Sequence, residues 1–185
     1  WFGQGTAPLD YRERWLSEAW AQYAAALWVR HRQGEPAFRD MMDRMARWAM
    51  RHDGAGPIHL GQRLGVLEED GRLYRAVVYD KGAWVLHMLR GIVGDDAFFA
   101  GTRAFLERHR FAKVATADLR EALERTSGRD LRSYFERWVY GTGLPRIVWS
   151  ARTRPAPGGF ETAVALHAQD LPDPVPVAIS VSTSA

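Results

Sequence analysis

Apolar residues recur at the spacing of amphipathic α-helices from residue 11 to residue 141. In one such stretch Pro36 suits the first helical turn and Gly34 suits the end of the preceding helix, and the apolar residues that keep helical spacing are Phe38, Met41, Met42, Met45, Trp48 and Ala49. The pattern predicts a glycine-rich loop over residues 53–65 and helices over residues 11–31, 36–52, 74–94, 95–109, 116–128 and 131–141.

After Pro145 the pattern changes to alternation and to β-branched residues, interrupted by turns that contain proline or glycine. It predicts three strands, over residues 146–153, 160–168 and 175–184. Three strands leave an unpaired edge, so we expect them to begin a larger β domain. The fold expected is therefore mainly α, with a helical domain over residues 1–145 and the start of a β-strand domain over residues 146–185.

The amino-acid composition of the chain argues against several classes of function. The chain carries a formal net charge of +3 and a pI of about 9.5, but its arginines alternate with acids, as in "DLREALERTSGRD". That alternation is typical of solvated helix faces and argues against nucleic-acid binding. No apolar run reaches the roughly 18 residues that span a bilayer. The chain contains no Cys, which excludes thiolate chemistry and favours a reducing, cytoplasmic location.

One acid lies at the head of the most apolar helix. In "WLSEAWAQYAAALW", residues 15–28, Glu18 is followed by no charged residue until Arg30. A carboxylate that faces a core is costly unless it is paired, hydrogen-bonded or bound to a metal. The residues alone also fit a simpler interpretation, in which Glu18 lies in the first helical turn, where the helix dipole favours an acid and water reaches it.

The second candidate is Tyr79, in "YDKGAWVLHMLR". Its phenol can donate a hydrogen bond to developing negative charge, and Gly82 allows another backbone or a ligand to come close. The alternative is a tyrosine that packs at a helix start with its hydroxyl in solvent. The sequence contains no His-x-x-x-His pair, no H-E-x-x-H, no phosphate loop and no G-x-S-x-G.

Four motifs follow one another along the chain: "WFG", "WLSEAWAQY", "YDKGAWVLHMLR" and "DLRSYFERWVYGTGLP". Their order resembles the membrane alanyl aminopeptidase family of gluzincin zinc peptidases, which includes the leukotriene hydrolase branch. In that family the zinc helix reads H-E-x-x-H-Q-W-F-G, and a Glu in a W-L-N-E-G-F-A-like segment follows the second His after a spacer of 18 residues. If a His and a Gln precede Trp1, Glu18 occupies that position.

The resemblance implies the helical C-terminal half of a thermolysin-like zinc peptidase catalytic domain, followed by the first strands of a β-sandwich. It implies that Glu18 is the third zinc ligand, that Tyr79 stabilises the oxyanion of the tetrahedral intermediate, and that Tyr74 is a second active-site tyrosine. Zinc would be the cofactor of the full-length protein, and peptides its substrates. Ser17 replaces the family's usual Asn, a change that we expect to alter packing rather than ligation.

The chain opens on Trp1 rather than Met, and we interpret it as a fragment of a longer protein. Both His ligands and the general base would lie in the missing N-terminal part, so the fragment alone is expected to bind no tight zinc and to be inactive. Two alternatives remain open: a related glycyl-aminopeptidase-type gluzincin, and a non-catalytic helical binding module with a peptidase-like fold. His-Glu-x-x-His-Gln before Trp1 would support the enzyme, and loss of either His would support the binding module.

Overall fold

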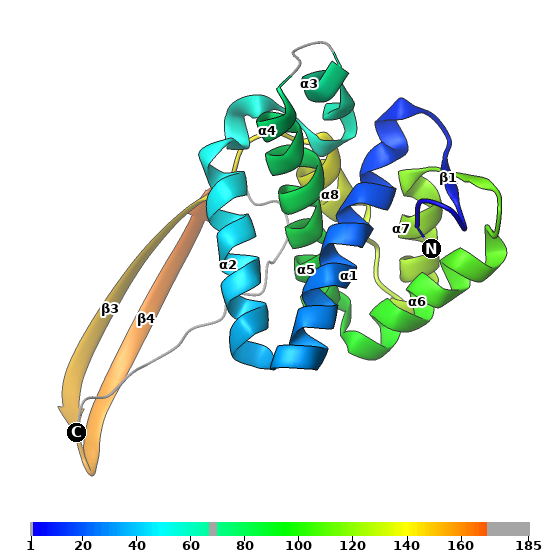
Figure 1. Cartoon of the computed structure of the whole chain (residues 1–185). Helices are drawn as coiled ribbons and strands as arrows, with labels where there is room; N and C mark the ends of the chain where they lie inside the picture. Colours follow the sequence, from blue (N-terminus) through cyan, green and yellow to red (C-terminus); the bar gives the residue numbers. More distant parts are fainter. Residues whose placement is uncertain (1, 67–69, 170–185) are drawn as a thin grey trace. The chain divides into compact units, whose positions relative to one another are not determined.

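The computed structural model describes residues 2–66 and 70–169. Within these ranges the chain forms two compact units, a helical unit up to Gly143 and a β-hairpin unit from Leu144 onward. Helices account for most of the described residues (Figure 1), so the prediction of a mainly α protein is confirmed. The assignment of the two units to a catalytic domain and the start of a β domain stays a prediction.

The helical unit contains short 3₁₀ segments and two π-helical segments beside its α-helices. In chain order its helical elements are η1 (Tyr11–Arg14), α1 (Trp15–Gln33), α2 (Glu35–Arg51), η2 (Asp53–Ala55), η3 (Ile58–Leu60), α3 (Gln62–Val66), α4 (Gly71–Tyr74), η4 (Arg75–Lys81), α5 (Gly82–Val93), α6 (Asp95–Arg108), α7 (Thr116–Ser127), α8 (Arg132–Phe135) and η5 (Glu136–Tyr140). Two short parallel strands, β1 (Ala7–Pro8) and β2 (Lys113–Val114), pair the N-terminal loop with the connection between α6 and α7.

The predicted helix boundaries hold best where the pattern is strongest. Those of α2, α6 and α7 lie within one residue of the prediction. Three predictions are wrong in part. Residues 11–14 are 3₁₀ rather than α-helical, since Asp10 caps a tight turn by accepting a hydrogen bond from the Arg12 amide at 2.7 Å. Residues 53–65 include η2, η3 and the start of α3 rather than one loop.

The third error concerns the helix expected over residues 74–94. It begins earlier, at Gly71, because the Asp70 side chain accepts hydrogen bonds from two amides of the first turn. It also changes to a π-helix at Arg75 and returns to α-helix at Gly82. The helix expected over residues 131–141 likewise ends in a π-helical turn. Apolar spacing over so few residues does not distinguish a π-helical turn from an α-helical one, so the sequence predicted a continuous α-helix in both places.

α1 forms the centre of the helical unit, where it packs against α2, α5 and η4 (Figure 1). Its apolar stripe follows helical spacing, and six side chains of the helix are buried: Trp15, Leu16, Ala19, Trp20, Tyr23 and Ala26. The residues between them face outward, and Glu18 is one of these half-buried residues. The helix therefore fixes Glu18 on a rigid element at the edge of the core.

The β unit is an antiparallel hairpin of β3 (Arg146–Ala156) and β4 (Gly159–Gln169), in register from the first pair to the turn. Two of the predicted strands are thus confirmed, each longer than expected. The third, over residues 175–184, lies outside the described residues. Trp149 and Phe160 are 68% and 77% exposed on the hairpin, and a two-stranded hairpin alone is only marginally stable in water.

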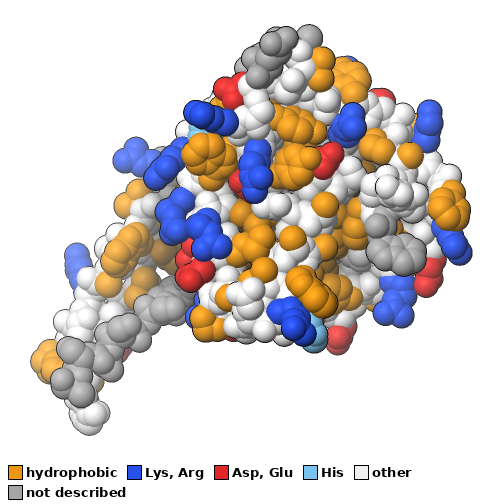
Figure 2. Space-filling view, viewed as in Figure 1, with side chains coloured by type: hydrophobic (Ala, Val, Ile, Leu, Met, Phe, Trp, Pro, Cys, Tyr) orange, Lys and Arg blue, Asp and Glu red, His pale blue; other side chains and the backbone are white. Residues whose placement is uncertain are grey.

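Charged side chains are dispersed over the helical unit. On the face in Figure 2, lysines and arginines are spread over several elements, and acidic side chains lie among them. Many of these acids and bases pair within one element, as Arg120 and Glu124 do on α7. Among the helices that the structure describes, none is long and apolar enough to cross a membrane.

Candidate functional site

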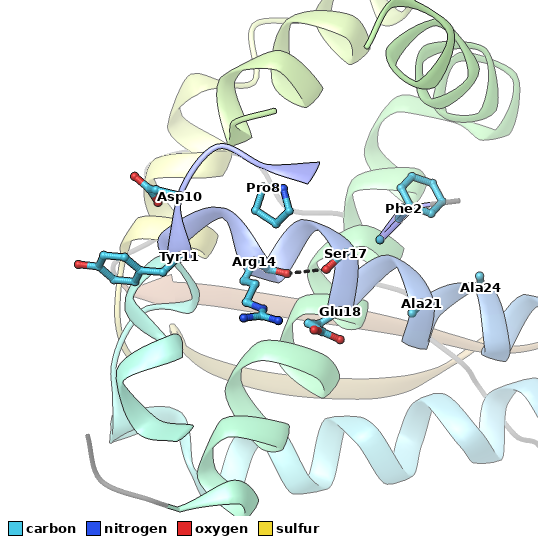
Figure 3. Close-up of a pocket in the computed structure, with 10 residues that line it drawn as sticks. Phe2, Pro8, Asp10, Tyr11, Arg14, Ser17, Glu18, Ala21 and Ala24 are labelled. Atoms are coloured by element: carbon cyan, nitrogen blue, oxygen red, sulfur yellow. Dashed lines mark hydrogen bonds between the residues drawn. The ribbon is translucent and has the colours of Figure 1, made fainter. Parts of the chain in front are cut away.

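A cavity of about 690 Å³ opens beside the first turns of α1 (Figure 3). Its wall combines the N-terminal loop, η1 and one side of α1, and its lining residues are Phe2, Gly3, Pro8, Asp10, Tyr11, Arg14, Ser17, Glu18, Ala21 and Ala24. In Figure 3, Arg14 and Glu18 point to the same side of the helix. The acid at the head of the apolar helix thus faces a cavity rather than the packed core.

The N-terminal motif "WFG" contributes to the same wall. Phe2 stacks on Trp20 with ring centroids 4.3 Å apart and planes at 1°, while Trp1 lies outside the described residues. Offset or parallel stacking of this kind contributes about 0.5–1.5 kcal/mol beyond burial. The stack therefore holds the entering chain against α1, at a residue two positions after Glu18.

Tyr79 reaches the site from η4, the π-helical segment. Its neighbours Val77, Val78 and Asp80 are buried, whereas Tyr79 itself is half-buried and lies close enough to Glu18 for the carboxylate to raise the pKa of its phenol. Isolated π-helical turns inside α-helices occur often at functional sites, since they reorient one side chain without ending the helix. Tyr74, one turn earlier, packs edge-on against Tyr79 with ring centroids 5.7 Å apart.

Gly82, the first residue of α5, permits the close contact between α1 and the start of α5, directly after η4. A Cβ atom added at Gly82 would lie 2.6 Å from the Cβ of Ala19, a distance that packed side chains do not tolerate. The sequence-based expectation that this glycine allows a close backbone approach is confirmed. Because Ala19 directly follows Glu18, the small pair sets the separation of Glu18 from Tyr79.

Electrostatics keep both phenols protonated. Burial raises the pKa of Tyr79 above its usual value, and the interaction with the nearby Glu18 carboxylate raises it further. Burial is also the main cause that raises the pKa of Tyr74, with a further contribution from Glu18. A tyrosine whose pKa is raised remains a neutral O–H donor at pH 7. Tyr74 donates its own hydrogen bond to Gln62 Oε1 at 3.1 Å.

Reasoning from the sequence missed two residues of this site, Arg14 and Gln62. Arg14 lines the cavity one helical turn before Glu18, and its charge acts on the pKa of both tyrosines, in the lowering direction. Helical spacing from Glu18 could have suggested Arg14. Nothing in the sequence near Gln62 points to its contact with Tyr74, because that contact depends on how α3 folds back.

A second acid, Glu13, also escaped notice. It is 7% exposed and accepts hydrogen bonds from the backbone amide of Thr116, at 2.8 Å, and from its hydroxyl. The same hydroxyl accepts from Trp15 Nε1 at 2.9 Å. Thr116 was expected only to open α7, but its main contacts tie that helix to the turn before α1.

Two charged residues directly after Tyr79 are buried. Asp80 is 4% exposed and accepts a hydrogen bond from Gln22 at 3.1 Å, so burial raises its pKa while Arg75 and Gln22 oppose that shift. Lys81 is 5% exposed, and burial lowers its pKa. These residues anchor η4 in the core, which leaves Tyr79 as the side chain of this turn that reaches Glu18.

The histidines form no metal site in the described ranges. No group of three His, Asp or Glu side chains there is arranged to hold a metal ion. His87 pairs with the Tyr23 hydroxyl at 3.1 Å and packs among aromatic rings. Arg90 donates to the same hydroxyl, so the Tyr23 proton points to His87 Nδ1, which acts as a neutral acceptor.

Comparison with known proteins identifies the family to which the chain belongs. The family model for the peptidase family M1 domain matches residues 1–138. Aminopeptidase N of Streptomyces lividans is 32% identical over 148 residues, which are 78% of this chain and 17% of that protein. Aminopeptidase N of Lactococcus lactis is 29% identical over 155 residues, 80% of this chain and 18% of that protein. The chain thus spans less than a fifth of the length of these relatives.

Comparison with solved structures leads to the same family. A mutant M1 zinc metallopeptidase from Deinococcus radiodurans, bound to a Tyr-Ser-Ala substrate, is 30% identical with a TM-score of 0.55, covering 79% of this chain and 32% of that one. Aminopeptidase A of Legionella pneumophila shares the fold at 19% identity, with a TM-score of 0.61 over 90% of this chain and 18% of that one. The resemblance inferred from four short motifs is confirmed, and the chain belongs to peptidase family M1.

Proposed function

We propose that the full-length protein is a zinc-dependent aminopeptidase, and that this chain supplies one zinc ligand, Glu18, and one oxyanion donor, Tyr79. The observation that carries the proposal is the proximity of these two residues, from α1 and η4, together with the position of Glu18 in the wall of a cavity. The names of the family relatives, which are aminopeptidases and zinc metallopeptidases, support it. The family match favours M1 over the glycyl-aminopeptidase type.

Glu18 suits a metal ligand. Its carboxylate is half-buried, faces the cavity, and forms no ion pair with any residue that the structure describes. Catalytic zinc takes three protein ligands and keeps an open position, so the other two would come from elsewhere in the full-length protein. When bound, zinc lowers the pKa of a water molecule and polarises the scissile carbonyl.

Tyr79 would act on the substrate by donating its hydrogen bond to the oxygen on which negative charge develops. Its phenol stays a neutral O–H donor because burial and Glu18 raise its pKa. Tyr74 would position the Tyr79 ring through their edge-on contact and is our second active-site tyrosine. The π-helical turn and Gly82 would hold this arrangement on rigid elements rather than on a loop.

Hydrolysis of short peptides by the full-length protein tests this function. We expect cleavage of a peptide with a free N-terminal amine, little cleavage of its N-acetylated counterpart, loss of activity with a chelator, and recovery with added zinc. A full-length protein that binds stoichiometric zinc without any hydrolysis, or that binds none, would support the non-catalytic binding module instead. The 185-residue chain alone is predicted to bind no tight zinc, as elemental analysis would show.

A further inference from the structure

Arg14 is a cation at the cavity wall that forms no ion pair with an acid of the described ranges. It is exposed, lines the cavity, and forms no ion pair with a residue of the described ranges. Only its backbone is engaged nearby, where its carbonyl oxygen accepts a hydrogen bond from Ser17 at 3.1 Å. In Figure 3 its guanidinium extends beside Glu18, while Asp10 points away from it.

The surroundings of Arg14 favour an anionic guest. Most of the lining is apolar, with Phe2, Pro8 and Ala21 among its members, and charges interact more strongly beside such surfaces than in bulk water. The charge of Arg14 extends over the site, since it acts on the pKa of both Tyr74 and Tyr79. The one acid of the lining that lies beside it, Glu18, is assigned to zinc by the proposed function.

We propose that Arg14 is a specificity-determining residue that binds a carboxylate of the peptide substrate. This inference rests on the proposed function, because it needs a peptide in the cavity and Glu18 engaged by zinc. A guanidinium pairs with a carboxylate through two parallel hydrogen bonds, which combine charge with fixed geometry. The protein therefore prefers peptides that place a carboxylate near the scissile bond over neutral peptides of the same shape.

Three sources of that carboxylate are distinguishable with matched peptide pairs. The pairs are Glu-Ala-amide with Gln-Ala-amide, Ala-Glu-amide with Ala-Gln-amide, and Ala-Ala with Ala-Ala-amide, so each differs by one carboxylate. We expect kcat/KM of the zinc-loaded full-length protein to favour the charged member of one pair, by on the order of tenfold at low salt. Arg14→Gln should abolish that ratio, and Arg14→Lys should retain part of it, because lysine keeps the charge without the planar fork.

The matched control is Arg44→Gln, on the exposed side of α2 and outside the cavity, which should leave all three ratios unchanged. Ratios in Arg14→Gln that stay within about twofold of the wild-type ratios for all three pairs would overturn the proposal. Isothermal titration calorimetry with the same peptide pairs and the full-length protein gives the ratio of their binding constants even if neither peptide is hydrolysed. Absence of hydrolysis with an Arg14-dependent binding ratio would contradict only the proposed function, whereas normal hydrolysis with unchanged ratios would contradict only the role of Arg14.

Discussion

Two acids five positions apart have opposite environments. Glu13, in η1, is almost fully buried, and the backbone and hydroxyl of Thr116 both donate hydrogen bonds to its carboxylate. Glu18, in the first turn of α1, is half-buried, faces a cavity and contacts a phenol that is itself held in place. The first acid has the partners expected of a structural group, and the second retains capacity for a ligand.

The difference shows what distinguishes a candidate functional carboxylate in this fold. Both residues are Glu, both lie near a helix start, and both are close to the same tryptophan-rich core. They differ in their hydrogen bonds. A buried carboxylate that accepts two hydrogen bonds contributes to stability, whereas a carboxylate that faces a cavity can bind a ligand there. The predictions below test whether stability and activity divide between them in this way.

The largest effect is expected from Glu18→Ala in the full-length protein. We expect kcat/KM for a free-amine peptide to fall by at least on the order of a thousandfold, because the metal that activates water would be lost. Glu13→Ala should instead lower stability by about 1–3 kcal/mol, since the Thr116 amide loses its acceptor, while the folded fraction keeps its turnover. Steady-state kinetics measure the loss of activity in each variant, and thermal unfolding measures its loss of stability. Equal losses of activity in the two would break the comparison.

The next largest effect on activity is expected from Tyr79→Phe. It removes the donor but not the ring, so we expect the zinc content to stay and kcat to fall by on the order of a hundredfold. Tyr74→Phe, which removes the hydrogen bond to Gln62 but keeps the ring contact with Tyr79, should cost less. Single-turnover kinetics with zinc analysis would separate chemistry from metal loss. Unchanged kcat in Tyr79→Phe would remove this residue from the mechanism.

Two glycines of α5 give a matched pair. Gly82→Ala would place its methyl group 2.6 Å from Ala19, so we expect a loss of about 1–3 kcal/mol in stability together with reduced activity as α1 and η4 separate. Gly91→Ala, where the added methyl group would meet no atom within 4 Å, should stabilise by about 0.5–1 kcal/mol through helix propensity. Denaturant unfolding measures both. Identical effects would show that the close approach does not matter.

The smallest effect concerns pH. Burial lowers the pKa of His87, and the charges of Arg90 and Arg30 add to that shift. The unfolded chain therefore binds the proton more readily, and the stability linked to His87 is present above about pH 6.5 and is lost as the pH falls below it. Melting temperatures of the full-length protein should decrease over that window. The decrease should be shallower in His87→Gln, and an unchanged slope would exclude this residue as a cause.

The sequence predicted those features that local patterns encode. The helices α2, α6 and α7 follow from apolar spacing and their end signals, and Glu18 and Tyr79 follow from motif order. Their proximity to each other is a finding of the structure. Their roles as ligand and donor stay predictions.

The remaining features depend on contacts between distant segments. Glu13 meets Thr116 across 103 positions, and Tyr74 meets Gln62 through a turn whose shape no spacing rule specifies. The π-helical turn of η4 buries Asp80 and directs Tyr79 to the site, yet its sequence fits an ordinary helix. Arg14 could have been suggested from the sequence, because it precedes Glu18 by one helical turn. An exposed arginine does not indicate a site, however, until the cavity beside it is known.

Zinc content is the most direct test of the central claim that Glu18 is a metal ligand. Full-length wild-type protein, Glu18→Ala and Glu13→Ala would be purified without added metal and assayed for zinc per folded molecule by elemental analysis. We predict about one zinc per molecule in the wild type and in Glu13→Ala, and little or none in Glu18→Ala. Stoichiometric zinc in a folded Glu18→Ala protein would contradict the assignment of Glu18 as a ligand.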